Sequence, residues 1–131
     1  MFRIQPDSPV PRYEQVVAQV VFGVASGALA PGDLIPSVRE LAGKLLINPN
    51  TVARAFQELE RLGVVRSLRG KGMEVTAEAP PWCRSHRQDL VRGRIADVMR
   101  EAVSSGLTAE AIVKLVEEEL ARANGRRGSR G

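Results

Sequence analysis

Hydrogen-bonding and basic side chains gather in two short stretches of this 131-residue chain. The first stretch contains Asn48, Pro49, Asn50, Thr51 and Arg54. Asparagine amides can donate to and accept from base edges, a threonine hydroxyl can do the same, and an arginine reaches guanine or phosphate. The second stretch is Arg69-Gly70-Lys71-Gly72, in which cations alternate with glycines. These residue types, at this spacing, are typical of nucleic-acid binding.

Two more candidates, Ser37 and Arg39, lie upstream in Ser37-Val38-Arg39-Glu40. This is the capping-box spacing, in which the Ser37 hydroxyl accepts a hydrogen bond from the Glu40 amide at the start of a helix. Ser37 can therefore serve as a cap alone. Arg39 would stand in the first helical turn, where the helix dipole does not favour a cation, so we interpret it as a contact to phosphate or a base. An ion pair with a nearby carboxylate is the alternative.

Structural roles also remain open in the first stretch. Asn48 is first of all a strong helix cap, and a DNA contact would be an additional role. Arg54 shares its helix with Glu58 and Glu60, so a solvated, ion-paired face is an equal alternative to DNA contact. For Arg61, on the same helix, the ion pair is the preferred interpretation.

The positive charge of the chain is concentrated around these candidates. The net charge is +4, from 19 Lys and Arg against 15 Asp and Glu, yet residues 1–80 are almost neutral, with nine basic and eight acidic residues. Within them, residues 37–72 hold seven basic and three acidic residues. The local excess, more than the bulk charge, points to a phosphate backbone as the partner.

Catalytic, metal and membrane functions have little support in the sequence. Cys83 and His86 have Cys-x-x-His spacing, but zinc needs about four ligands and the chain has one cysteine and one histidine. Apart from a site shared across a dimer, we expect no metal, and we place both residues at the surface or in a linker. No catalytic constellation or phosphate-binding glycine loop is visible, so we expect no cofactor and no enzyme. The lone cysteine and the short apolar run at 16–25 indicate a cytoplasmic protein without a membrane partner.

Helix signals predict the elements that position the candidates. A first helix over 11–27 has an apolar face of Tyr13, Val16, Val17, Val20, Val21 and Val24. A second helix begins at Ser37 and ends near Leu45. A third helix runs from Pro49 to about residue 62, because asparagine caps a helix well and proline suits its first position. Its inner face is Val52, Phe56 and Leu59.

Two short strands, at residues 64–68 and 73–76, follow the third helix, and an extended stretch is expected at 34–36. The glycines of Arg69-Gly70-Lys71-Gly72 permit the positive φ values of a hairpin turn between the two strands. Helix, strand, two helices joined by a tight turn, and a hairpin is the order of a winged helix-turn-helix. In that fold the third helix enters the DNA major groove. The hairpin is then the wing, with two cations at its tip.

Beyond Pro80-Pro81 the pattern is helical only, with two helices joined by a short link at 105–107. Their apolar positions are Leu90, Val91, Ile95, Val98, Met99 and Ala102 in the first, and Ile112, Leu115, Val116 and Leu120 in the second. Two helices are too small for a core of their own, so this face should be buried against the first domain or a second copy.

The predicted fold class is α+β, mainly α. We expect a winged helix-turn-helix DNA-binding domain over residues 1–80, a two-helix dimerisation hairpin over 81–123 and a flexible basic tail over 124–131.

Several motifs resemble those of one family. Pro31-Gly32-Asp33-Leu34-Ile35-Pro36-Ser37-Val38-Arg39-Glu40-Leu41-Ala42 resembles the signature of the GntR family of bacterial transcription regulators. Residues 48–56, 59–63 and 69–72 are similar to its YtrA subfamily. The resemblance covers about residues 2–78 and implies a homodimeric repressor with its winged helix on DNA. Position by position, it implies DNA contacts by Ser37, Arg39, Asn48, Asn50, Thr51 and Gly70.

The function expected is therefore sequence-specific transcriptional regulation by a homodimer that reads a pseudo-palindromic, double-stranded DNA operator. An unidentified small-molecule effector would have to bind at the dimer interface or between domains, because two helices enclose little volume. The alternative is a protein-interaction module on a winged-helix scaffold, since fold alone does not fix function. Only 51 residues follow Pro80, so no appended catalytic domain is expected.

Overall fold

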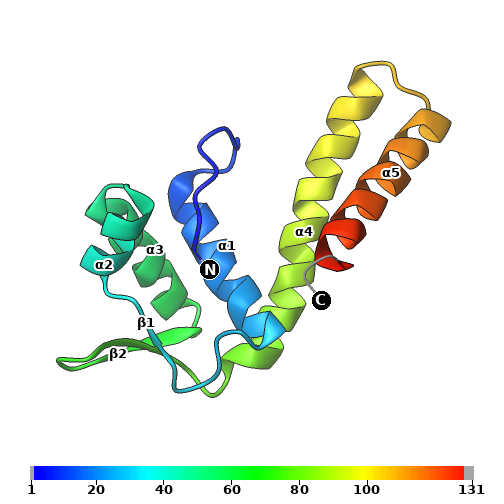
Figure 1. Ribbon diagram of the computed structural model, residues 1–131. Coiled ribbons are helices and arrows are strands. Elements are labelled where there is room, and N and C mark those ends of the chain that lie inside the picture. The colour runs from blue at the N-terminus through cyan, green and yellow to red at the C-terminus, as the bar shows by residue number, and fades with distance from the viewer. Residues whose placement is uncertain (1, 129–131) are drawn as a thin grey trace. The chain divides into compact units, whose positions relative to one another are not determined.

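The computed structural model describes residues 2–128, which form helices and one antiparallel sheet in two compact units, Met1–Leu90 and Val91–Gly131 (Figure 1). The elements in chain order are α1 (Arg12–Ser26), β1 (Leu34–Ile35), α2 (Val38–Leu45), α3 (Pro49–Arg61), β2 (Val65–Leu68), β3 (Gly72–Val75), α4 (Ala79–Ser104) and α5 (Ala109–Gly128). The predicted fold class is confirmed: an N-terminal winged helix-turn-helix is followed by two helices.

The core of the first unit lies between α1, α3 and the sheet. It includes Val16, Val20, Val21 and Val24 of α1, Val52, Phe56 and Leu59 of α3, and Val65 and Val75 of the strands. Tyr13 and Val17 pack against this core but remain half-buried. Valine is a mediocre helix former, so α1 is stabilised by this packing, with about 1.5 kcal/mol or more gained for each fully buried valine.

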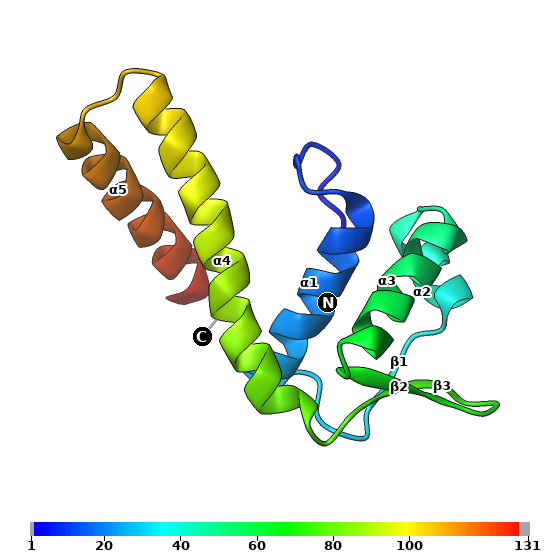
Figure 2. The same ribbon diagram turned by 180° about the vertical axis from the view of Figure 1, so that it is seen from behind.

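The sheet has the strand order β1-β3-β2. Val65 pairs with Val75 and Leu68 with Gly72, which leaves Arg69, Gly70 and Lys71 as the loop of the hairpin. β1 is only two residues long and pairs with β3 on its other edge. Figures 1 and 2 both show the β2–β3 hairpin extending away from the helices, as a wing does.

Helix α4 begins earlier than the sequence pattern indicates. We expected Pro80 and Pro81 to close the first unit, but both lie in the first turn of α4. The first N–H groups of a helix have no intrahelical acceptor, so proline is tolerated there. Cys83 is fully buried in the core of the first unit, so its expected surface or linker position is wrong.

In the second unit, α4 and α5 lie side by side and antiparallel (Figures 1 and 2). Gly106 takes a φ of 93° in the link, and Thr108 Oγ1 accepts a hydrogen bond of 3.2 Å from the Ala111 amide at the start of α5. The helix continues to Gly128, which is well into the segment 124–131 expected to be flexible. The rest of that segment lies outside the described residues. Within the described chain, neither helix is apolar enough over a sufficient length to span a membrane.

Candidate nucleic-acid interface

The turn between α2 and α3 sets the position of the candidate recognition helix. Ser37 caps α2 as predicted, with its Oγ accepting from the Glu40 amide over 3.1 Å. The residue that follows α2 and caps it is Leu46, which takes the left-handed conformation with φ 56° and ψ 45°. A leucine in this conformation is strained by about 1–2 kcal/mol, and its side chain is 89% exposed. The left-handed conformation of Leu46 turns the chain tightly between α2 and α3.

Helix α3 begins directly after the turn. Asn48 Oδ1 accepts a hydrogen bond of 2.8 Å from the Asn50 amide, and Pro49 occupies the first turn, so the predicted cap is confirmed. Asn48, Pro49 and Asn50 are exposed, while Thr51 is half-buried. The cap uses only the Oδ1 atom of Asn48, and the Asn50 side chain is not needed to hold the helix. The first turn of α3 therefore presents amide groups to solvent.

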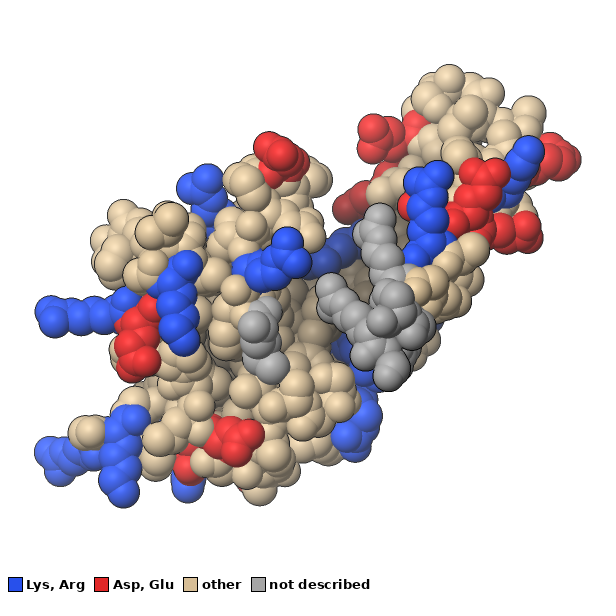
Figure 3. All heavy atoms as spheres, viewed as in Figure 1, with Lys and Arg blue, Asp and Glu red and all other residues tan. Residues whose placement is uncertain are grey.

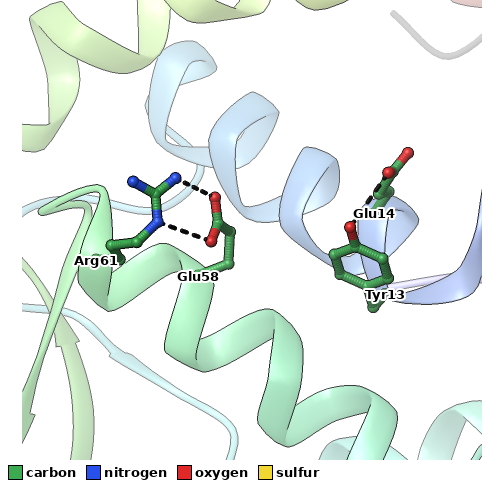
Figure 4. Close-up of polar contacts among 4 residues, drawn as sticks. All are labelled: Tyr13, Glu14, Glu58 and Arg61. Carbon is green, nitrogen blue, oxygen red and sulfur yellow. Dashed lines mark hydrogen bonds and ion pairs between the residues drawn. The ribbon is translucent and has the colours of Figure 1, made fainter.

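The two arginines of α3 have different partners. Arg61 forms an ion pair with Glu58, with Nε 3.0 Å from Oε2 (Figure 4), so the ion-pair interpretation of Arg61 is confirmed. Hydrogen bonding from Arg61 holds the pKa of Glu58 below its usual value. Arg54 instead places its guanidinium carbon 3.8 Å from the centre of the Tyr13 ring on α1. The ion-paired alternative for Arg54 is not what the structure adopts.

The wing tip is exposed and built by its glycines. Gly70 has a φ of 75° and Gly72 a φ of 95°, as the turn prediction required. The Lys71 amide donates to the Leu68 carbonyl over 3.0 Å, which closes the turn. Arg69, Gly70 and Lys71 are all exposed. On the face shown in Figure 3, basic side chains project from the wing tip and from the region of α2 and α3.

Ion pairing divides the seven basic residues of 37–72 into two groups. Arg61 pairs with Glu58, and Arg66 pairs with Glu74 across β2 and β3. The other five form no ion pair with any described residue: Arg39, Lys44, Arg54, Arg69 and Lys71. Two of them lie on α2, one on α3 and two at the tip of the wing. Exposed cations without carboxylate partners can neutralise phosphates.

The spacing of apolar residues places Tyr13 on the inner face of the first helix and indicates no functional role for Arg12. In the structure both residues line a polar hollow together with Thr51 and Arg54, beside the start of α3. The hollow is also lined by Gln5, Pro6, Ser8, Pro9, Val10, Pro11 and Gln15. Tyr13 and Arg54 are too far apart in the chain for any spacing rule to relate them. Only the packing of α1 against α3 brings them together.

No group of three or more His, Cys, Asp or Glu side chains able to hold a metal ion occurs among the described residues. The ring of His86 stacks on the ring of Trp82, with centroids 4.4 Å apart.

Comparison with known proteins agrees with this geometry. The family model for bacterial regulatory proteins of the gntR family matches residues 12–75. The HTH-type transcriptional repressor YtrA of Bacillus subtilis (strain 168) is 34% identical over 118 residues, 90% of this chain and 91% of that protein.

Two solved structures extend the comparison. A GntR family transcriptional regulator from Listeria monocytogenes is 30% identical, with a TM-score of 0.65, and the match covers 86% of this chain and 97% of that chain. The DNA-binding domain of AraR, solved in complex with an operator, is 25% identical, with a TM-score of 0.52 over 58% of this chain and 96% of that chain. With a relative matched over almost the full length of both chains, this protein belongs to the GntR family of bacterial regulatory proteins.

Proposed function

We propose that this protein is a homodimeric transcriptional repressor that binds a pseudo-palindromic DNA operator. The observation that carries the proposal is the exposed, capped start of α3 on a unit whose α2, α3 and wing carry five exposed cations that pair with no described carboxylate. In a winged helix-turn-helix this helix end enters the major groove, where base edges carry the sequence information. Amide groups at the helix start and cations around it are the two kinds of contact that such binding requires.

The candidate residues then divide by role. Asn50, Thr51 and, beyond its cap, Asn48 read base edges from the first turn of α3, with Pro49 fixing the backbone there. Arg39 approaches from the start of α2, and Arg54 from the second turn of α3. Arg69, Gly70 and Lys71 contact the phosphate backbone or the minor groove from the wing. Ser37 supports this surface by capping α2.

The proposed dimer forms through the second unit. Helices α4 and α5 leave large apolar side chains exposed, among them Ile95 at 54%, Val98 at 56% and Leu120 at 58%. The proposed interface consists of these side chains together with Val91, Met99, Ala102, Ile112, Leu115 and Val116, and most of them line one apolar hollow between the two helices. Leu90, which the sequence pattern also places in this interface, packs instead against the core of the first unit. Contiguous apolar faces of this kind are rarely left to solvent. A second copy supplies a matching surface, and dimerisation places two copies of α3 on one duplex.

The names of the relatives favour regulation over catalysis. YtrA of Bacillus subtilis is described as a transcriptional repressor, and AraR was solved with an operator. We extend repression and operator binding from those proteins to this one, and we propose no enzymatic activity and no cofactor. Any effector would bind at the dimer interface or between domains.

Selection of bound DNA from a random pool tests the proposal. We expect enrichment of an inverted repeat whose half-site centres lie about one duplex turn, ~34 Å, apart. Affinity for that sequence should fall steeply with salt, because counterions are released from the neutralised phosphates. Failure to enrich any sequence would favour the alternative of a protein-interaction module.

Two substitutions test the reading surface with the selected sequence. Arg39→Ala and Asn50→Ala should together weaken operator binding by at least about tenfold, since each lost contact costs about 1–3 kcal/mol. Arg61→Ala is the matched control, because Arg61 is an exposed arginine already paired with Glu58. The assignment of this surface is wrong if the double variant binds as well as the wild type while its melting temperature is unchanged.

A further inference from the structure

The contact between Tyr13 and Arg54 joins α1 to the candidate recognition helix. The guanidinium carbon of Arg54 lies 3.8 Å from the centre of the Tyr13 ring. A cation is attracted to the negative face of an aromatic ring at this distance. Tyr13 is half-buried and packs against the core, whereas Arg54 is exposed. The ring is thus the fixed partner, and it restricts the directions that the long arginine side chain can take.

The Tyr13 side chain makes a hydrogen bond in addition to its packing against the core. Its hydroxyl donates to Glu14 Oε1 over 3.3 Å (Figure 4). The segment before α1 is tied to the helix by Gln15, whose Oε1 accepts from the Gln5 amide at 2.8 Å and whose Nε2 donates to the Val10 carbonyl at 2.9 Å. Part of this segment lines the same hollow as Tyr13. The ring therefore packs against the core and lines a hollow whose other wall includes this anchored segment.

Arg54 keeps its hydrogen-bonding capacity in this arrangement. Stacking occupies the flat face of a guanidinium and leaves the N–H donors at its edges. Glu58, one helical turn further on, is the nearest carboxylate that could compete for them on α3, but it is bound by both Nε and a terminal nitrogen of Arg61. The guanidinium of Arg54 is therefore held against the ring, and its N–H groups form no ion pair with a described carboxylate.

We propose that Tyr13 is a positioning residue for DNA binding, which stacks on Arg54 and presents the N–H edge of this arginine to the operator beside the first turn of α3. This inference rests on the proposed function. Pre-orienting a long side chain lowers the conformational entropy lost on binding. It also confines Arg54 to one group on the DNA, so that Tyr13 affects sequence preference without touching a base.

A double-mutant cycle with the full-length protein and its selected operator tests this role. Tyr13→Leu keeps an apolar side chain but removes the ring, and should weaken operator binding about three- to tenfold. Tyr13→Phe keeps the ring and should bind within about twofold of the wild type. In an Arg54→Ala background, Tyr13→Leu should cause no further loss, because the residue that it positions is already absent.

Val17→Ala is the matched control, since Val17 lies one turn further along α1 and also packs half-buried against the core. It should lower the melting temperature without changing operator affinity.

The inference is overturned if Tyr13→Leu weakens binding equally with and without Arg54, or if Tyr13→Phe loses as much operator affinity as Tyr13→Leu. If the wild-type protein enriches no DNA sequence, the proposed function fails and this inference with it. If Arg39→Ala and Asn50→Ala weaken binding but Tyr13→Leu does not, only the positioning role is wrong.

Discussion

Cys83 shows how burial controls the chemistry of a single side chain. Its residue is 0% exposed in the core of the first unit, and this burial raises the pKa of the thiol to about 11, because a thiolate is poorly solvated there. The folded protein therefore holds the thiol proton more tightly than the unfolded chain does. The resulting stability is complete below the ordinary thiol pKa of 9.0 and is lost as the pH rises toward about 11.

We therefore predict that the free energy of unfolding of the wild-type protein falls between pH 9 and pH 11 by more than that of Cys83→Ala. Urea unfolding at pH 7, 9 and 10.5 measures this difference. Cys83→Ala should be less stable than the wild type at pH 7, because it leaves a small cavity, and the gap should narrow at alkaline pH. A gap that stays constant with pH would show that the thiol titrates normally.

At the scale of elements, the sequence predicts best what local chemistry decides. The caps of α2 and α3 at Ser37 and Asn48 require only residues two or three positions apart, and both form as expected. The wing turn likewise follows from Gly70 and Gly72, whose positive φ values need no distant partner. Local rules therefore locate most of the candidate interface.

Features that depend on contacts between distant residues, or on an uncommon backbone conformation, could not be predicted from such local rules. The start of α4 at Ala79 was missed because Pro80 and Pro81 suggest an end, although they are equally suited to a first helical turn. The stacking of Arg54 on Tyr13 was missed because the sequence offers nearby carboxylates and gives no sign of a ring from another helix. The left-handed conformation of Leu46 was missed because leucine rarely adopts it.

The wing allows a prediction about salt dependence. Arg69 and Lys71 are exposed, unpaired and at the hairpin tip, so each should neutralise one phosphate. Replacing both by alanine should reduce the slope of log affinity against log salt by about two per subunit, and should weaken operator and non-operator DNA to a similar degree. Fluorescence anisotropy titrations at four salt concentrations measure the slope.

The control is Arg66→Ala, which removes an arginine paired with Glu74 on the same hairpin and should leave the slope almost unchanged. An unaltered slope in the double variant would exclude the wing from phosphate contact.

At the scale of the whole molecule, the boundary between the two units decides which truncation is informative. Ala79, Cys83 and Leu90 pack in or against the core of the first unit, so this unit needs the beginning of α4. A fragment of residues 1–90 should be a folded monomer, whereas a fragment of residues 1–82 should be strongly destabilised. The monomer should bind the operator far more weakly than the full-length protein, because the second half-site loses its tethered partner.

Sedimentation and thermal unfolding of the two fragments, with operator titrations of the longer one, test this prediction. The full-length double variant Ile95→Glu and Leu120→Glu provides the matched control, because it places charges on the apolar face of the second unit and leaves residues 1–90 intact. It should sediment as a monomer and bind the operator as weakly as the 1–90 fragment. If the 1–90 fragment is a dimer, the interface lies in the first unit. If the double variant remains a dimer with wild-type affinity, the apolar face of α4 and α5 does not join the two copies, and the operator geometry would have to be derived from another contact.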